Sequence, residues 1–169
     1  VYQLLNDSWT QLGLDINGEA SYNYFGSSVS LSSDGKTVAV GAPYNDDNGS
    51  NSGHVRVYNY YLGFWIQLGS DINGEVSSDY SGWSVSLSSD GTTLAVGAPY
   101  NDGNESDSGH VRIYNYNGTS WSQLGEDIDG EAANDQSGYS VSLSSDGTTL
   151  AIGANKNDSN GNDSGHVRI

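Results

Sequence analysis

The chain has 169 residues and is strongly acidic, with 21 Asp and Glu against five Lys and Arg and a formal net charge of −16. Nucleic acids and anionic lipids are bound through clusters of Lys and Arg, so this charge argues against both and favours cations or basic partners. The chain contains no Cys, which excludes disulfides and thiolate metal sites, and no apolar run approaches the length of a membrane span. Twelve Tyr, four Trp and regularly placed aliphatic residues supply a core, which argues against disorder.

One sequence unit recurs every 56 residues without an insertion or a deletion. The segments WTQLGLDINGE, WIQLGSDINGE and WSQLGEDIDGE carry it, and they begin at Trp9, Trp65 and Trp121. Self-similarity at such a fixed period is the signature of a repeat architecture. We therefore predict one domain of three tandem repeats.

The repeats are divided here at residues 1–56, 57–112 and 113–169. Ile169 falls in register with Val1, so the chain begins and ends inside the same predicted strand. The chain also contains no Met. From these two features we expect it to be a section of a longer protein, with association between chains as the alternative.

Each repeat is predicted to hold four short strands, here described for the middle copy. In residues 83–88 apolar side chains alternate with Ser, which is the pattern of a half-buried strand, and Asp90-Gly91 follows as a tight turn. Residues 92–99 form the second strand, with small Ala and Gly on one face that would permit close packing of a neighbouring sheet. Residues 109–116 and the Trp-x-Gln-Leu segment 121–124 form the third and fourth strands. No segment has helical periodicity, so the predicted fold class is all-β, with four-stranded antiparallel sheets repeated every 56 residues.

The first two strands carry a family resemblance. FGSSVSLSSDGKTVAVGAP, residues 25–43, resembles the FG…GAP signature of integrin α-chain propellers and their FG-GAP repeat relatives, and GHVRVY resembles the strand that follows it. Of the residues in the name, Phe is retained only at Phe25, and Pro only at Pro43 and Pro99. The resemblance covers essentially the whole chain and implies β-propeller blades. Propellers close with about four to eight blades, so three repeats imply partners that are further copies or adjacent repeats.

The resemblance also implies calcium in acidic loops. The connections from the fourth strand of one repeat to the first strand of the next carry oxygen-bearing side chains at relative positions 1, 3, 5 and 9, the side-chain spacing with which integrin-type loops hold the ion. These residues are Asp15, Asn17, Glu19, Asn23, Asp71, Asn73, Glu75, Asp79, Asp127, Asp129, Glu131 and Asp135. In the family, however, the calcium loop lies between the first and second strands, which here is the short SSDGKT or SSDGTT.

A second acidic series lies between the second and third strands, at alternate positions of each loop: Asp46, Asn48 and Ser50; Asp102, Asn104 and Ser106; Asp158, Asn160 and Asn162. For both series the alternative is a solvated turn, since Asp, Asn and Gly are also chosen for turn geometry. His54, His110 and His166 are interpreted as structural, and Arg56, Arg112 and Arg168 as ties to carboxylates of neighbouring repeats.

Six N-x-[ST] sequons lie outside the predicted strands and fit a secreted, glycosylated surface, although an Asn- and Ser-rich chain also produces them by chance. They are at Asn6, Asn48, Asn104, Asn117, Asn157 and Asn162. No Ser, His and Asp constellation breaks the repeat symmetry, so we expect no enzymatic activity. The sequence favours an extracellular, non-catalytic module for structural assembly or adhesion through its acidic loops, with an extracellular protein or polysaccharide as a further partner. The alternative is a propeller that binds a ligand or carbohydrate and depends on calcium.

Overall fold

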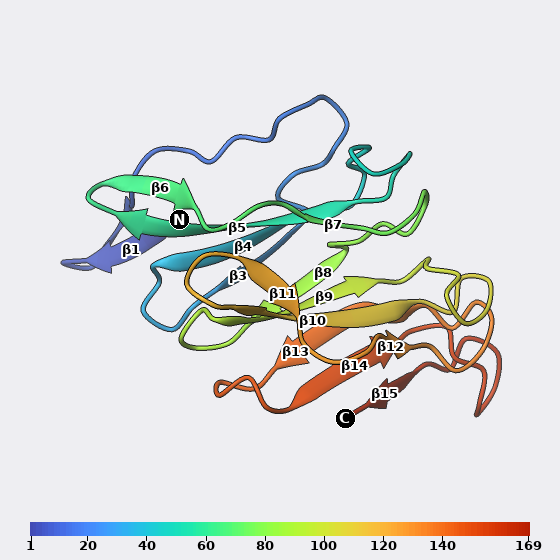
Figure 1. Cartoon of the computed structure of the whole chain (residues 1–169). Coiled ribbons are helices and arrows are strands. Elements are labelled where there is room, and N and C mark those ends of the chain that lie inside the picture. The colour runs from blue at the N-terminus through green and yellow to red at the C-terminus, as the bar shows by residue number, and fades with distance from the viewer.

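The structure, a computed structural model, describes residues 1–169 and consists of fifteen strands without a helix (Figure 1). The prediction of an all-β chain is therefore confirmed. In chain order the strands are β1 (Tyr2–Leu5), β2 (Ser8–Gln11), β3 (Ser28–Leu31), β4 (Thr37–Ala42), β5 (His54–Tyr61), β6 (Phe64–Gln67), β7 (Ile72–Asn73), β8 (Ser84–Leu87), β9 (Thr93–Ala98), β10 (His110–Tyr116), β11 (Trp121–Gln123), β12 (Ile128–Asp129), β13 (Ser137–Leu143), β14 (Leu150–Ala154) and β15 (His166–Arg168).

The strands form four antiparallel sheets. An N-terminal hairpin pairs β1 with β2; the first sheet has the order β3-β4-β5-β6, the second β8-β9-β10-β11, and the third β13-β14-β15. Ser84–Leu87 pair with Leu94–Gly97, as the alternating pattern and the Asp-Gly turn predicted.

The first and second sheets contain a fifth strand that the sequence reading missed. Strand β5 is eight residues long, and β6 covers only its second half, from Tyr58 to Tyr61. The free edge at His54 and Val55 is covered by the two-residue strand β7, and β12 does the same for β10. The expected four-stranded sheet is therefore not what the structure has: these sheets have five strands, and the third has three.

The core lies between successive sheets, which stack face to face (Figure 1). Ala39, Val55 and Val57 of the first sheet pack against Val85, Leu87, Leu94 and Val96 of the second. Ala95 and Val111 of the second sheet pack in turn against Ile152 of the third. The burial of Val85 and Leu87 that alternation predicted is confirmed.

Glycine allows the sheets to approach closely. A Cβ on Gly41 in β4 would lie 2.1 Å from the carbonyl oxygen of Gly82, and one on Gly97 in β9 would lie 2.1 Å from that of Gly138. Both distances are impossible for real atoms, so only glycine fits at these two positions. The small residues of the second strand thus permit the close packing that the sequence predicted.

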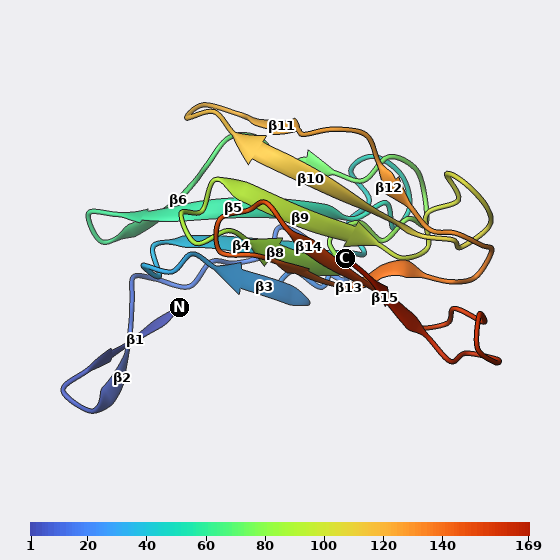
Figure 2. The same cartoon turned by 90° about the horizontal axis from the view of Figure 1, so that it is seen from below.

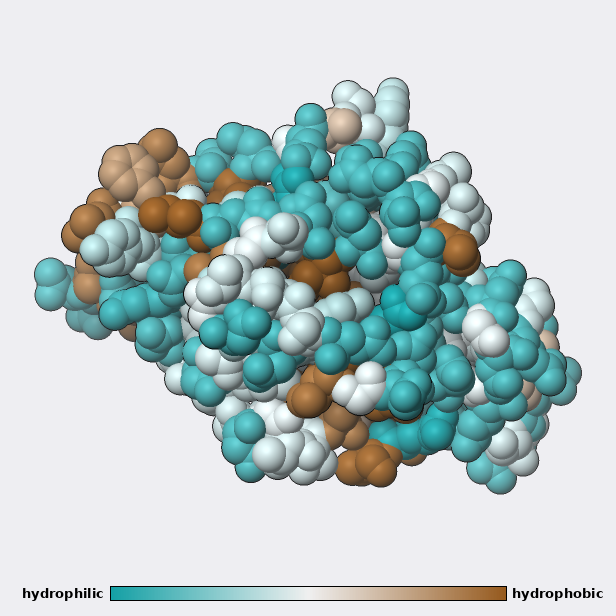
Figure 3. Space-filling view, viewed as in Figure 1, coloured by the Kyte–Doolittle hydropathy of each residue, from teal (hydrophilic) through white to brown (hydrophobic).

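The stack is open, and its sheets do not close into a ring. The N-terminal hairpin projects away from it, and β15 lies at the edge of the third sheet (Figure 2). On the outer face of the first sheet, Val29 and Leu31 are 64% and 47% exposed, whereas their counterparts Val85 and Leu87 are 9% and 7% exposed. Apolar side chains also gather on the surface near the tip of the β5–β6 hairpin (Figure 3), where Leu62 and Phe64 are exposed.

Candidate metal-binding site

Arg56, on β5, joins two successive connections between repeats. Its Nε and Nη2 donate hydrogen bonds of 2.8 and 2.7 Å to the two carboxylate oxygens of Asp71, which follows β6. Its Nη2 also donates to Glu19, which precedes β3. A planar guanidinium suits this two-point contact with a carboxylate, so Arg56 orients both acids.

The same arrangement recurs 56 residues later. Arg112 donates hydrogen bonds of 2.9 and 2.8 Å to Asp127 and forms an ion pair with Glu75. At the third position the pair is looser, with Arg168 Nε 3.7 Å from Glu131 Oε1. The interpretation of these arginines as ties between neighbouring repeats is confirmed.

The arginine contacts keep the two paired aspartates ionised. Hydrogen bonding from Arg56 lowers the pKa of Asp71, and hydrogen bonding from Arg112 lowers that of Asp127, in both cases against the opposing effect of burial. Hydrogen bonding to Asp71 in turn raises the pKa of Arg56 above its ordinary value. The result is a fixed carboxylate beside the first residue of β5 and of β10.

That first residue is a histidine. His54 is 1% exposed, and its Nδ1 lies 3.7 Å from Asp47 Oδ2 and 3.8 Å from Asp71 Oδ2. The nitrogen is buried and has no hydrogen-bond partner. Burial, followed by the nearby Arg56, lowers the pKa of His54, so the imidazole is neutral at neutral pH.

Two clusters in the chain bring together enough ligand groups to hold a metal ion. In the first, one ligand atom from each of Glu19, Asp47, His54 and Asp71 lies within 4.8 Å of every other. The second contains three residues by the same measure: Glu75, His110 and Asp127. It lacks a fourth because Gly103 stands where the first repeat has Asp47.

The four predicted calcium positions of one connection do not converge on one point. Asp71 joins the first cluster, whereas Glu75, four residues later, joins the second. Asp15 accepts a hydrogen bond of 2.8 Å from Gln11. Glu131 lies 3.8 Å from His166. Calcium bound by each connection as a unit therefore stays a prediction.

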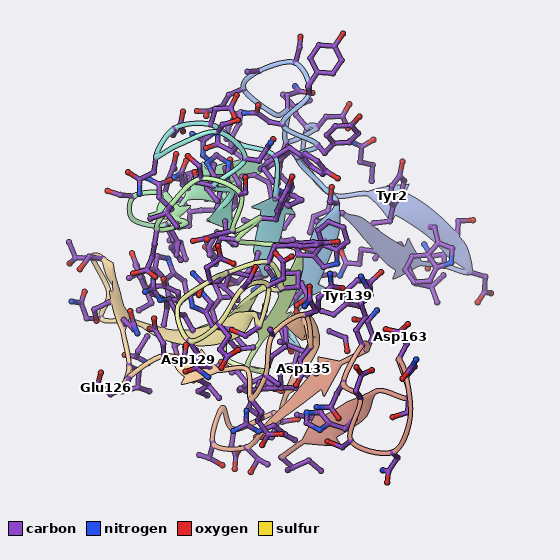
Figure 4. The ribbon with its side chains drawn as sticks, turned by 90° about the vertical axis from the view of Figure 1, so that its right-hand side faces the viewer. Tyr2, Glu126, Asp129, Asp135, Tyr139 and Asp163 are labelled. Carbon is purple, nitrogen blue, oxygen red and sulfur yellow. The ribbon has the colours of Figure 1, made fainter.

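The remaining positions of that series differ in burial. Asn17, Asn73 and Asp129 are exposed, whereas Asn23, Asp79 and Asp135 are buried. Asp79 accepts a hydrogen bond of 3.1 Å from the Val76 amide, and Asp135 one of 2.7 Å from Asn157 Nδ2. Asp129 lies on β12, and Asp135 lies at a separate point along the connection to β13 (Figure 4).

The hairpin between the first and second strands of each repeat does not fit a calcium cage. Asp34 Oδ1 accepts hydrogen bonds from the Ser32 hydroxyl at 2.7 Å and the Lys36 amide at 2.9 Å. Asp90 Oδ1 is engaged in the same way by Ser88 and Thr92. Each carboxylate closes its own turn, as the short hairpin predicted.

The loops between the second and third strands are likewise closed by their own side chains. Asp46, Asp102 and Asp158 each accept a hydrogen bond from the amide five residues later. Asn48 Nδ2 donates to the Gly74 carbonyl at 2.7 Å, and Asn104 Nδ2 donates to that of Gly130 at 3.0 Å. These contacts agree with the reading of this series as turn geometry.

The sequons differ in accessibility. Asn6, Asn48, Asn104, Asn117 and Asn162 are exposed, and their glycosylation stays a prediction. Asn157 is buried and uses its Nδ2, the atom that would carry the glycan, to bind Asp135. Glycosylation at Asn157 likewise stays a prediction, and in the folded chain its Nδ2 is covered.

Sequence reasoning missed Asp47 and took His54 as purely structural. The signal for Asp47 was its departure from the repeat, since the equivalent positions are Gly103 and Ser159. His54 gave no such signal, because its counterparts His110 and His166 recur in register. Its contact with Glu19, 35 residues earlier, arises only from the packing of adjacent connections.

A family model described as FG-GAP repeat matches three segments, residues 17–58, 73–114 and 128–169. A comparison with curated proteins found no significant match. None of the elements is a helix long and apolar enough to cross a membrane.

Proposed function

Because this chain belongs to the FG-GAP repeat family, we propose that it is a non-catalytic, extracellular section of a propeller-type array that assembles through the outer faces of its terminal sheets. Each 56-residue repeat contributes one blade, built on a four-strand path. The observation that supports this proposal is a set of contacts that joins the first sheet to the second and, in register, the second to the third.

Most of these contacts between sheets are hydrogen bonds made by serine hydroxyl and backbone groups. Ser28 Oγ donates a hydrogen bond of 2.7 Å to the Gly82 carbonyl. The equivalent bond from Ser84 Oγ to the Gly138 carbonyl is also 2.7 Å. The amide of Ser89 donates to the Ser145 carbonyl at 2.9 Å, repeating the bond from Ser33 to Ser89. The same rotation and translation thus relates the first sheet to the second and the second to the third, as in repeat proteins whose units contact only their neighbours.

The outer faces of the first and third sheets have no neighbouring sheet packed against them. Val29 and Leu31 on the outer face of the first sheet are exposed, and so is Val167 on β15. A further repeat placed by the same operation would cover both faces. Such a contact is head-to-tail, so repetition produces either a closed ring or a filament. The acidic loops lie outside these faces and remain available for adhesion.

Sedimentation velocity over a range of concentrations tests the proposal. The chain is expected to self-associate, and Val29→Asp is expected to weaken association because it places a charge on a face that association would bury. Val76→Asp is the matched control, since Val76 is exposed on a connection outside the stacking faces. A folded chain that stays monomeric at every concentration, or equal loss in both variants, would count against assembly through these faces.

An aromatic ladder supports carbohydrate binding as a second function. The ring centroids of Tyr24 and Tyr44 lie 4.8 Å apart, and those of Tyr44 and Tyr80 lie 5.1 Å apart. A hollow of about 360 Å³ is lined by four aromatic residues, Tyr44, Tyr80, Trp83 and Tyr100, and by the polar Ser78 and Asp107. Apolar ring faces beside a few polar groups suit the mixed surface of a sugar.

Calorimetric titration with neutral polysaccharides, with and without calcium, tests this second function. Tyr44→Ala is expected to weaken binding because it removes a wall of the hollow. Tyr22→Ala is the control, since Tyr22 is highly exposed and belongs to no ring pair. Equal affinity in the two variants would exclude the aromatic ladder as the binding surface.

A further inference from the structure

We propose that Glu19, Asp47, His54 and Asp71 form a site for a divalent transition-metal ion, of which zinc is the representative, in the first repeat alone. The proposal concerns the loop ends of the sheets and is independent of assembly through their faces. It rests on three features: a buried nitrogen without a partner, the charge of the cluster, and a difference between the repeats.

The first feature is the geometry around His54 Nδ1. This nitrogen is buried, has no hydrogen-bond partner, and faces carboxylate oxygens of Asp47 and Asp71 at 3.7 and 3.8 Å. These separations are too long for hydrogen bonds. Zinc bonds of about 2.0–2.2 Å place neighbouring ligand atoms about 3.4 Å apart, so an ion between the three groups requires only a small inward movement.

Arg56 holds two of the ligand side chains in place, and the side chain of Asp47 can move. Asp71 Oδ1 accepts hydrogen bonds from Arg56 Nε at 2.8 Å and Gln67 Nε2 at 2.6 Å, which hold the carboxylate. Its Oδ2 accepts one bond of 2.7 Å from Arg56 Nη2 and faces His54 with its remaining lone pair. The side chains of Glu19 and Asp47 are 43% and 52% exposed. Asp47, which Arg56 does not contact, can therefore move by the short distance that coordination requires, whereas Glu19 is held by its bond to Arg56 Nη2. The exposure of both side chains provides the path by which an ion enters.

The charge of the cluster favours a divalent ion. Three carboxylates, from Glu19, Asp47 and Asp71, surround the imidazole, and together with the single guanidinium of Arg56 they sum to a charge of −2. The imidazole decides which class of ion is preferred. Calcium and magnesium select oxygen ligands, whereas zinc and its neighbours in the first transition row also bind imidazole nitrogen.

The second repeat provides an internal comparison. Its cluster of Glu75, His110 and Asp127 has the same buried, unpartnered Nδ1 but lacks the fourth ligand, because residue 103 is Gly. With Arg112 its net charge is only −1. In the third repeat His166 has a single acid neighbour, Glu131, at 3.8 Å. The complete set therefore occurs once.

The test uses the chain without a histidine tag, dialysed against a chelator and titrated with CoCl₂ alone or ZnCl₂ alone. Visible absorption reports tetrahedral cobalt, and calorimetry reports zinc. We expect each chain to bind one cobalt or zinc ion tightly, and calcium to displace that ion poorly. Asp47→Gly, which recreates the second repeat in an exposed loop, should weaken binding at least tenfold. His54→Ala should abolish the cobalt spectrum, and His166→Ala is the matched control that should leave it unchanged.

A converse variant builds a site where none is expected. Gly103→Asp should add a second equivalent, because the amide of residue 103 already contacts Asn101 Oδ1 at 2.7 Å, as the Asp47 amide contacts Asn45 Oδ1 at 2.9 Å. Three outcomes would overturn the proposal: no stoichiometric binding by the folded chain, equal affinity in Asp47→Gly, or displacement by equimolar calcium. None of them affects self-association, so the two proposals fail separately.

Discussion

The indole nitrogen of Trp65 donates a hydrogen bond of 2.8 Å to the carbonyl oxygen of Leu12, which lies 53 residues earlier in the chain. Trp121 makes the equivalent bond of 2.9 Å to Leu68. Each of these tryptophans thus ties the fourth strand of a sheet to the connection that precedes that sheet. The bond is therefore a contact between repeats and not within a hairpin.

Trp65→Phe is expected to lower the free energy of unfolding by about 1 kcal/mol, because the ring is largely kept while the Leu12 carbonyl loses its donor. Urea denaturation monitored by circular dichroism measures the change. Trp9→Phe is the control, since Trp9 is 69% exposed and should cost little. Equal losses in the two variants would contradict the assigned role of the Trp65 bond.

Gly41→Ala is expected to destabilise the chain by about 1–3 kcal/mol, because its Cβ would collide with the backbone carbonyl of Gly82. Gly153→Ala should cost less. Gly153 occupies the same position in the third sheet, where the three atoms nearest to a Cβ all belong to Ser140 and the nearest is its hydroxyl oxygen. Thermal melts of the two variants compare a glycine beneath a neighbouring sheet with one that has no such neighbour.

The Asp-Gly turns should make stability fall in acid. Hydrogen bonds from the Ser88 hydroxyl and the Thr92 amide lower the pKa of Asp90 from 3.8. A carboxyl group whose pKa is lower in the folded chain stabilises the fold above the unfolded value and loses this contribution as the pH falls through the folded value. The loss should therefore begin below about pH 4. Because the turn is largely exposed, Asp90 contributes under about 1 kcal/mol.

Asp90→Asn checks the sign of this effect. The amide oxygen of Asn accepts the same hydrogen bonds but does not titrate in this range. Urea midpoints of the variant and the parent chain should therefore converge as the pH falls from 5 to about 3. A difference between them that grows over the same interval would be inconsistent with a lowered pKa at Asp90.

Joining two copies in register should stabilise both. A fusion in which Ile169 is followed by Tyr2 of the second copy preserves the 56-residue period. It places the outer face of one third sheet against the outer face of the next first sheet. Nearest-neighbour contacts add to the stability of each repeat, so the fusion should melt at a higher temperature than the single chain. A fusion with five Gly inserted at the junction is the control, and equal melting temperatures would oppose the predicted contact.

The longer strands could be predicted because the patterns that specify them lie within a few neighbouring residues. Alternation in residues 83–88 and the Asp-Gly turn after them specify a hairpin whatever surrounds it. Strands β7 and β12 could not, because two residues carry no period. They form where a long third strand leaves its edge uncovered, and this depends on how far β6 and β11 extend.

The candidate site was predictable only in part. The sequence selects Glu19 and Asp71 as oxygen ligands but assigns them to different loops. In the structure both carboxylates form ion pairs with the guanidinium of Arg56. Spacing along a sequence describes a loop that folds around its own ion. It does not describe ligands that meet because repeats are stacked, which is how His54 comes to face an acid from the preceding connection.

The sharing of each arginine between two connections also limits how such a chain can change length in evolution. Arg56 needs one acid encoded earlier in its own repeat and another encoded in the next repeat. Removal of part of a repeat would leave a partly buried guanidinium short of a partner, whereas duplication of a whole 56-residue unit keeps the two acids of Arg56 and of Arg112. Growth by complete units is therefore the change in length that these ion pairs tolerate.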